Sequence, residues 1–83
     1  MIEQAKVSED FIESVARLCL RKKHIYLACE KKSQMTKISQ GLKKYKIVKK
    51  RGVYTNRGIV VFTVGEVNES FINYFDFIYE VSK

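Results

Sequence analysis

Apolar residues recur every three or four positions between Glu9 and Lys22, which is the spacing of one face of an α-helix. Ser8 is a residue type that caps helices, and the two acids after it favour the positive end of a helix dipole. The stripe consists of Phe11, Ile12, Val15, Ala16, Leu18 and Cys19. The pattern predicts a helix over residues 9–22.

A second helical pattern runs from Gln34 to Lys44, with Ser33 as the expected cap. Its apolar stripe is narrow and consists of Met35, Ile38, Leu42 and Tyr45. The opposite side of this helix is polar and basic, and it carries Thr36, Lys37, Gln40, Lys43 and Lys44. Such side chains bond both phosphates and base edges, so this face is a candidate nucleic-acid site.

Residues 46–64 have the pattern of a β-hairpin. An extended segment ends near Tyr54, an Asn- and Gly-containing turn follows, and a β-branched run begins at Ile59. We expect the first arm to be basic and Arg57 to lie at the tip of the turn. The candidate binding residues here are Lys49, Lys50, Arg51 and Arg57.

Two segments fit more than one structure. Residues 24–30 alternate as a strand would, but they also fit a short helical face, and seven residues do not decide between these. Residues 68–83 favour a helix capped by Asn68 or Ser70, although several aromatic residues share the parity of a strand.

The C-terminal segment is apolar nearly all round, so as a helix it needs cover on more than one side. In so small a chain a second subunit is the expected cover, and we predict a homodimer. The candidate interface residues are Phe71, Tyr74, Phe75, Phe77 and Ile78.

Composition and charge narrow the choice of function. Hydrophobic residues make up 46% of the chain, which indicates a folded protein, and 83 residues predict a single domain over 1–83. The net charge is +7, but residues 17–57 alone hold fourteen Lys and Arg and one acid, Glu30. A block of +13 repels itself unless an anionic surface neutralises it, and duplex DNA is such a surface. An anionic membrane and an acidic protein partner are alternatives.

The expected elements follow one another as helix, short element, helix, basic hairpin and helix. This order is similar to that of a family of α+β folds. Residues 25–64, and above all Met35–Arg51, resemble the winged helix-turn-helix family of DNA-binding regulators. The small size and the Lys and Ile content resemble regulators encoded by archaeal viruses or plasmids. The turn before the second helix departs from the family pattern, with Lys32 and Ser33 in place of glycine and an apolar residue.

The resemblance implies sequence-specific binding of double-stranded DNA and regulation of transcription. The helix from Gln34 would enter the major groove, with Thr36, Lys37 and Gln40 facing bases. Lys43 and Lys44 would hold phosphates, and the wing would grip the backbone or a minor groove.

Other functions have weaker support in the sequence. The single histidine, His24, and the dispersed glycines form no catalytic or phosphate-loop motif, so we expect no enzyme, no cofactor and no small-molecule substrate. Cys19 and Cys29 suit small buried hydrophobes, with a disulfide as the alternative, and no metal site is expected. No apolar run is long enough to span a bilayer and no signal peptide is visible, so we expect a cytoplasmic protein, and a membrane is not among its expected partners.

Two further alternatives stay open. A module that binds RNA or single strands could use Tyr26, Tyr45 and Tyr54 to stack on bases. A small protein-interaction module could dock on an acidic partner. A strand at residues 25–30 would argue against the helix-turn-helix.

Overall fold

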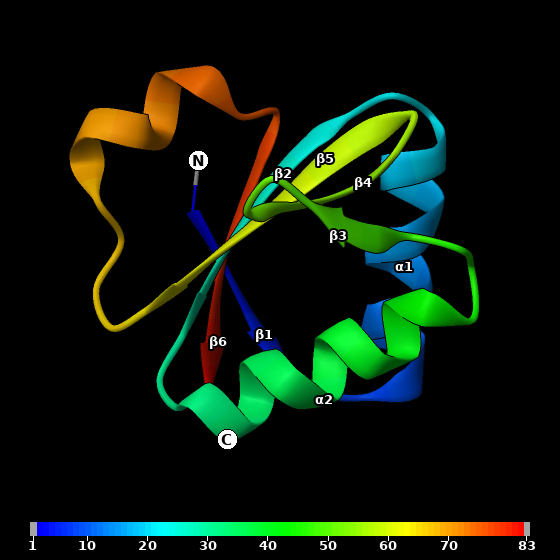
Figure 1. Ribbon diagram of the computed structural model, residues 1–83. Coiled ribbons are helices and arrows are strands. Elements are labelled where there is room, and N and C mark those ends of the chain that lie inside the picture. Colours follow the sequence, from blue (N-terminus) through cyan, green and yellow to red (C-terminus); the bar gives the residue numbers. More distant parts are fainter. Residues whose placement is uncertain (1, 83) are drawn as a thin grey trace.

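The structure, a computed structural model that describes residues 2–82, is an α+β fold built on one six-stranded mixed sheet. The strand order is β1-β6-β2-β5-β4-β3 (Figure 1). The elements, in chain order, are β1 (Ile2–Lys6), α1 (Glu9–Leu20), β2 (His24–Cys29), α2 (Lys32–Lys43), β3 (Val48–Lys50), β4 (Val53–Asn56), β5 (Gly58–Val64), the 3-10 helix η1 (Glu69–Tyr74) and β6 (Phe77–Ser82).

Both α-helices pack on the same face of the sheet. The connections β1–α1–β2 and β2–α2–β3 cross the sheet in the same direction, which places the two helices on one side (Figure 1). The core between helices and sheet contains Val15, Cys19, Leu27, Ile38 and Leu42, all fully buried. The predicted stripes of both helices therefore do face the core.

The two predicted α-helices are confirmed, with small shifts in their bounds. Ser8 caps α1 as expected, since its Oγ accepts a hydrogen bond from the N–H of Phe11 at 3.1 Å. The second helix begins two residues before the predicted start, and Lys31 rather than Ser33 is its N-cap.

Residues 24–29 form the strand β2, and this corrects the expected winged helix-turn-helix. β2 pairs in parallel with β5 on one side and with β6 on the other. Ile25 through Cys29 are all buried because helices cover one face of this central strand and η1 covers part of the other. A strand buried on both faces gives a continuous apolar run rather than an alternating one. The first helix of the expected helix-turn-helix is therefore missing.

The favoured C-terminal helix is also wrong beyond residue 74. Asn68 does cap a helix, its Oδ1 accepting from the N–H of Ser70 at 3.0 Å, but that helix is the short η1. Residues 77–82 then form β6, inserted between β1 and β2. Tyr79 and Val81 pack toward the α-helices while Ile78 is buried on the opposite face. Burial from both sides explains the apolar character that the sequence analysis assigned to a second subunit.

The basic hairpin is confirmed in part. β4 and β5 are antiparallel around Arg57, as expected, but the first arm contains a second turn at Arg51-Gly52 and so becomes two short strands, β3 and β4. β3 is the edge of the sheet. The strand β1, at the other edge, has no counterpart in the elements expected from the sequence.

Candidate nucleic-acid interface

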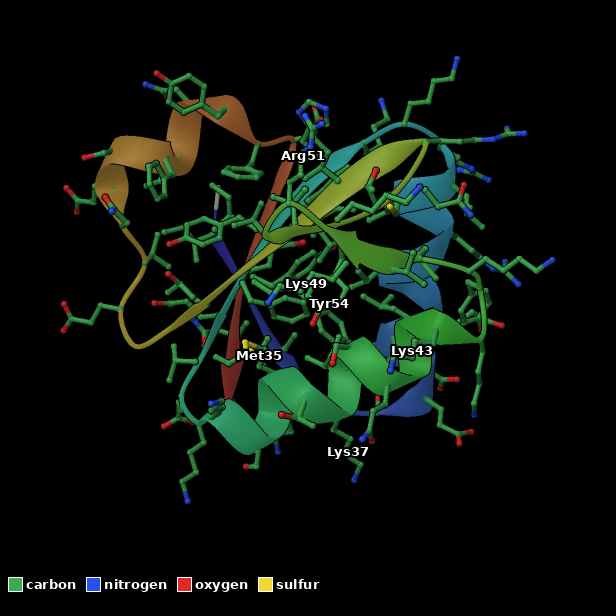
Figure 2. The ribbon with its side chains drawn as sticks, viewed as in Figure 1. Met35, Lys37, Lys43, Lys49, Arg51 and Tyr54 are labelled. Carbon is green, nitrogen blue, oxygen red and sulfur yellow. The ribbon has the colours of Figure 1, made fainter. Side chains whose placement is uncertain are left out.

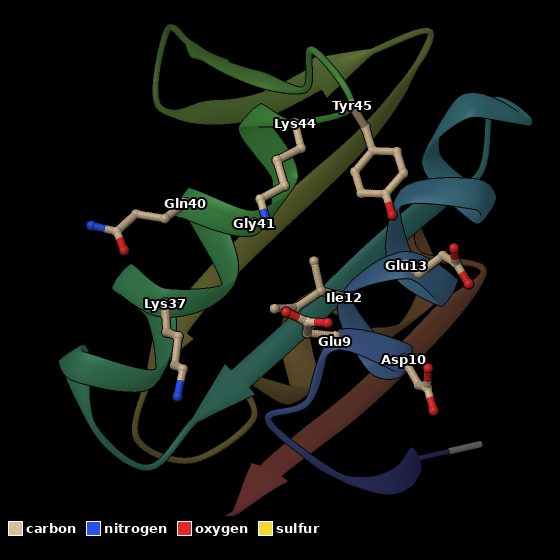
Figure 3. A pocket seen from close by; sticks show the side chains of 9 residues that line it. All are labelled: Glu9, Asp10, Ile12, Glu13, Lys37, Gln40, Gly41, Lys44 and Tyr45. Carbon is tan, nitrogen blue, oxygen red and sulfur yellow. The ribbon is translucent and has the colours of Figure 1, made fainter.

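The polar face of α2 is not one continuous surface. Lys37, Gln40 and Lys44 line a pocket of about 410 Å³ between α1 and α2 (Figure 3). The α1 side of the same pocket carries three carboxylates, those of Glu9, Asp10 and Glu13. Phosphates approaching these lysines would meet acids, so this half of the predicted site is a poor surface for a polyanion.

The two helices are close here because residue 41 is glycine. A Cβ at Gly41 would lie 2.7 Å from Cγ2 of Ile12, which is less than van der Waals contact. The glycine that weakens α2 as an isolated helix is therefore needed for the packing of α2 on α1.

The other predicted residues of α2 lie outside this pocket. Thr36 is exposed, but its Oγ1 donates to the carbonyl of Lys32 at 3.1 Å, within its own helix. Lys43 is exposed near the C-terminal end of α2 (Figure 2). The structure thus separates the five residues that the sequence analysis placed on one DNA-reading face.

The edge strand β3 presents cations on both faces of the sheet. Lys49 pairs with Tyr54 and lies on the side of the α-helices, whereas Lys50 pairs with Val53 and lies on the opposite side. Arg51 follows in the turn with a φ of 53°. We call Lys49, Lys50 and Arg51 the basic edge.

A second group of cations lies at the end of the sheet where β2, β3 and β5 begin. Three turns meet there: the α1–β2 turn, the α2–β3 turn and the β4–β5 turn (Figure 1). The N–H of Ile59 donates to the carbonyl of Lys23 at 3.1 Å, and Nδ2 of Asn56 donates to the carbonyl of Lys46 at 3.2 Å. We call the cations of these turns the basic end; they are Arg21, Lys22, Lys23, Lys46 and Arg57.

Three residues of the basic end have left-handed backbone conformations. The φ angles are 68° for Lys22, 61° for Lys46 and 73° for Arg57. Both lysines occupy the position after a helix where glycine is usual, in Schellman motifs. The N–H of Lys22 donates to the carbonyl of Cys19 at 2.9 Å, and the N–H of Lys46 donates to the carbonyl of Lys43 at 2.9 Å.

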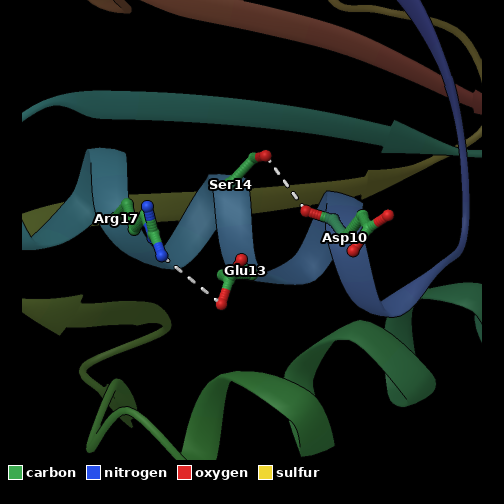
Figure 4. A network of polar contacts seen from close by, with 4 residues as sticks. All are labelled: Asp10, Glu13, Ser14 and Arg17. Carbon is green, nitrogen blue, oxygen red and sulfur yellow. Dashed lines mark hydrogen bonds and ion pairs between the residues drawn. The ribbon is translucent and has the colours of Figure 1, made fainter.

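The cations of the basic end and edge have no acidic partners. Among residues 2–82 the one ion pair joins Arg17 to Glu13 at 3.6 Å on the surface of α1 (Figure 4). Asp76, which precedes β6, is held by the backbone at this end of the sheet, where its Oδ2 accepts from the N–H of His24 at 2.8 Å. The positive charge is therefore available to an external anion.

Many of the acids lie at the opposite end. Glu30, Glu66 and Glu80 line a pocket of about 490 Å³ where β2 and β5 finish. The side chain of Glu80 accepts from Nε2 of Gln4 at 2.5 Å. The chain thus separates its charges along the strand direction.

Sequence reasoning missed four of the five residues of the basic end and found only Arg57. The sequence assigns Arg21, Lys22 and Lys23 to the C-terminal end of the first helix, which cations suit, and Lys46 to the first arm of the hairpin. Their joint position depends on parallel pairing between β2 and β5, which the sequence analysis did not predict.

The tyrosines of the basic segment are not presented for stacking. Tyr26 is fully buried, stacks on Phe75 with ring centroids 5.1 Å apart, and accepts at its hydroxyl from the N–H of Asn68. Tyr45 and Tyr54 are half-buried. In residues 2–82, neither the basic end nor the basic edge includes an exposed aromatic side chain.

Most of the predicted dimer residues are used within the chain. Phe75 packs on Tyr26, Phe77 packs against the core, and Ile78 is 3% exposed. Phe71 and Tyr74, which are 43% and 72% exposed, are the two that remain on the surface.

The cysteines are free and buried, as small hydrophobes would be, so the disulfide alternative is wrong. Burial raises the pKa of the Cys29 thiol to about 11, and burial likewise raises that of Cys19. In residues 2–82 no cluster of three or more His, Cys, Asp or Glu is placed to hold a metal ion, and no helix is long and apolar enough to cross a membrane.

Comparison with known proteins adds no relative: no family model matches the chain, and no similar protein was found among curated sequences or solved structures.

Proposed function

We propose that this protein binds double-stranded DNA through the phosphate backbone, with the basic end and the basic edge as the contact surface. The observation that carries the proposal is the collection of cations from three separate turns at one end of the sheet, none of which forms an ion pair with another of residues 2–82. Each neutralised phosphate releases counterions, which favours binding of such a surface to DNA.

The backbone conformations support the same surface. A residue with a side chain in the left-handed region costs roughly 1 kcal/mol relative to glycine, and strained residues of this kind concentrate at functional sites. Lys22 and Lys46 accept this cost at positions where glycine is the common choice. Selection for charge at these points explains lysine there better than selection for stability does.

Duplex is favoured over single strands because base stacking needs exposed rings, and the exposed aromatic residues Phe71 and Tyr74 lie elsewhere. The longest extent of the molecule, 27 Å, corresponds to about eight base pairs at 3.4 Å each. Contact through α2 in the major groove is disfavoured by the acids of α1, so sequence-specific reading and transcription regulation stay predictions that this proposal does not require.

Fluorescence anisotropy with a labelled 20-base-pair duplex tests the proposal. If about six phosphates are neutralised, a plot of log affinity against log salt concentration should have a slope of about −5. Lys46→Gln and Arg57→Gln should each weaken binding and flatten that slope by about one. The matched control is Lys6→Gln, which removes one exposed charge at the end of β1 and should leave binding unchanged.

Competitors separate the alternatives. Duplex DNA should displace the probe better than single-stranded DNA or an acidic polypeptide of equal charge. A slope shallower than about −2, or equal losses for Lys6→Gln and Lys46→Gln, would overturn the proposed surface. Better competition by the acidic polypeptide would favour a protein partner instead.

A further inference from the structure

The side of the sheet away from α1 and α2 is covered over only part of its width. The short helix η1 packs there on β2, where Phe71 and Phe75 contact the ring of Tyr26 with centroids 6.3 Å and 5.1 Å away. Tyr26 and Ile78, in the central strands β2 and β6, are 0% and 3% exposed. No other helix of residues 2–82 lies on this side (Figure 1). The strands β4 and β3, which lie beyond β5, therefore lack a covering element here.

The uncovered part of this face is apolar. The residues of β5 that pack toward the α-helices alternate with Ile59 and Val61, which therefore lie on the far side. By the register of β4 and β5, Val53 lies beside Val61, and all three residues are partly exposed. Val48 shares this side with Lys50 and is 38% exposed. We call Val48, Val53, Ile59 and Val61 the open strip.

The helix η1 stands above the sheet beside the open strip and is itself exposed. Phe71 and Tyr74 are 43% and 72% exposed. The ring of Tyr26 raises η1 from the sheet, since the N–H of Asn68, the cap of η1, donates to the Tyr26 hydroxyl at 3.0 Å. This face of the molecule therefore consists of a ridge with exposed aromatic rings and a lower apolar strip.

The ridge and the open strip carry opposite charges. Residues 43–57 contain seven cations and no acid, whereas residues 58–82 contain four acids and no cation. On this face Lys50 lies at the β3 margin and Glu69 lies in the first turn of η1, and both are exposed. Neither forms an ion pair with another of residues 2–82. A surface with one positive and one negative margin is complementary to a second copy of itself, which a polyanion or a partner of one charge is not.

We propose that this face is the interface of a homodimer, in which η1 of each protomer packs on the open strip of its partner. A two-fold axis parallel to the strands brings the ridge of one copy over the β3 margin of the other, and it does so twice. The rings of Phe71 and Tyr74 then lie on the partner's open strip, and Glu69 faces the partner's Lys50. The interface thus includes strands β3, β4 and β5, none of which the sequence analysis assigned to a dimer.

Sedimentation velocity of the full chain without DNA, at low salt and tens of micromolar protein, tests the proposal. The natural protein should be a dimer. Lys50→Glu and Glu69→Lys should each raise the dimer Kd at least about tenfold, because each places like charges opposite one another at both copies of the contact. The double variant reverses both signs and should return the Kd to within about threefold of that of the natural protein.

Lys49→Glu is the matched control, since it reverses the neighbouring charge of β3 on the side of the α-helices and should leave the dimer intact. A monomeric natural protein, an equal loss in Lys49→Glu, or a double variant no better than the single ones would overturn the proposal. Lys49 and the basic end lie outside this interface. Failure of duplex binding would therefore leave the dimer standing, and a monomer that binds duplex would remove the dimer alone.

Discussion

At Lys22 and Lys46 the side chain supplies positive charge but makes the backbone conformation less favourable than it would be for glycine. Each lies at a φ above 60° immediately after a helix, where the missing Cβ of glycine would remove a steric cost. Both side chains are exposed, so packing does not compensate for that cost. Stability and electrostatics therefore pull these two positions in opposite directions.

Lys46→Gly should raise the free energy of unfolding by up to about 1 kcal/mol, because glycine adopts the left-handed region without strain. The same substitution should weaken duplex binding, since one phosphate contact is lost. Urea unfolding and anisotropy measure the two effects. Lys46→Gln should weaken binding without the gain in stability, and a Lys46→Gly protein that binds DNA normally would contradict the assignment of Lys46 to the surface.

Cys29 predicts a loss of stability at alkaline pH. Burial raises the pKa of its thiol from 9.0 to about 11, so between these values the folded protein keeps a proton that the unfolded chain has released. Because only the folded state keeps the Cys29 proton in this range, the free energy of unfolding is highest below pH 9 and falls as pH rises toward 11. Urea unfolding across this range should show a shallower decline for Cys29→Ala, and identical slopes in the two proteins would exclude the thiol as the cause.

At the level of elements, amphipathic helices could be predicted and buried strands could not. α1 and α2 follow a 3.6-residue period because each has one apolar face and one solvated face. β2 and β6 are covered on both faces, and a run such as Ile25–Cys29 carries no period that separates strand from helix. The resemblance to a winged helix favoured a helix for this run, whereas the structure has the central strand β2 there.

The candidate site divides in the same way. Lys49, Lys50, Arg51 and Arg57 could be predicted because a hairpin is local in sequence, so its turn and its exposed arm follow from residues 46–64. The basic end could not, because Lys22 and Arg57 are brought together only by parallel pairing of strands distant in the chain.

Gly41 gives a prediction about the contact between α1 and α2. Alanine at this position is favoured by about 1 kcal/mol in an isolated helix, but its Cβ would lie 2.7 Å from the branched Cγ2 of Ile12. We expect Gly41→Ala to destabilise the protein by about 1–2 kcal/mol, since overpacking exceeds the helical gain. In an Ile12→Ala background the same change should be neutral or stabilising, and a thermal unfolding cycle of the four proteins measures this coupling.

For the whole molecule, the separation of charge is the dominant feature. Cations gather where β2, β3 and β5 begin, and Glu30, Glu66 and Glu80 lie where β2 and β5 finish and β6 approaches its end. A molecule with this arrangement orients in the field of a polyanion before contact, so association with DNA should be fast and sensitive to salt.

The homodimer stays a prediction, with its surface reduced to Phe71, Tyr74 and their neighbourhood on η1. Sedimentation velocity at tens of micromolar should show a dimer for the natural sequence and a monomer for Tyr74→Ser. Tyr74 makes a suitable probe because it is 72% exposed and its removal should not disturb the core. A natural protein that sediments as a monomer would show that the chain acts alone.

The position of β6 sets the order in which the sheet can assemble. Among the described strands, β1 pairs with β6 alone, so Ile2 has no strand neighbour until Ile78 is in place. The strand β2 likewise lacks one of its two partners until β6 has formed. During synthesis residues 77–82 must therefore leave the ribosome before the sheet can close, and contacts of such long sequence separation slow folding. Nascent chains that stop short of residue 77 should stay sensitive to protease, whereas the released protein becomes resistant in a single cooperative step.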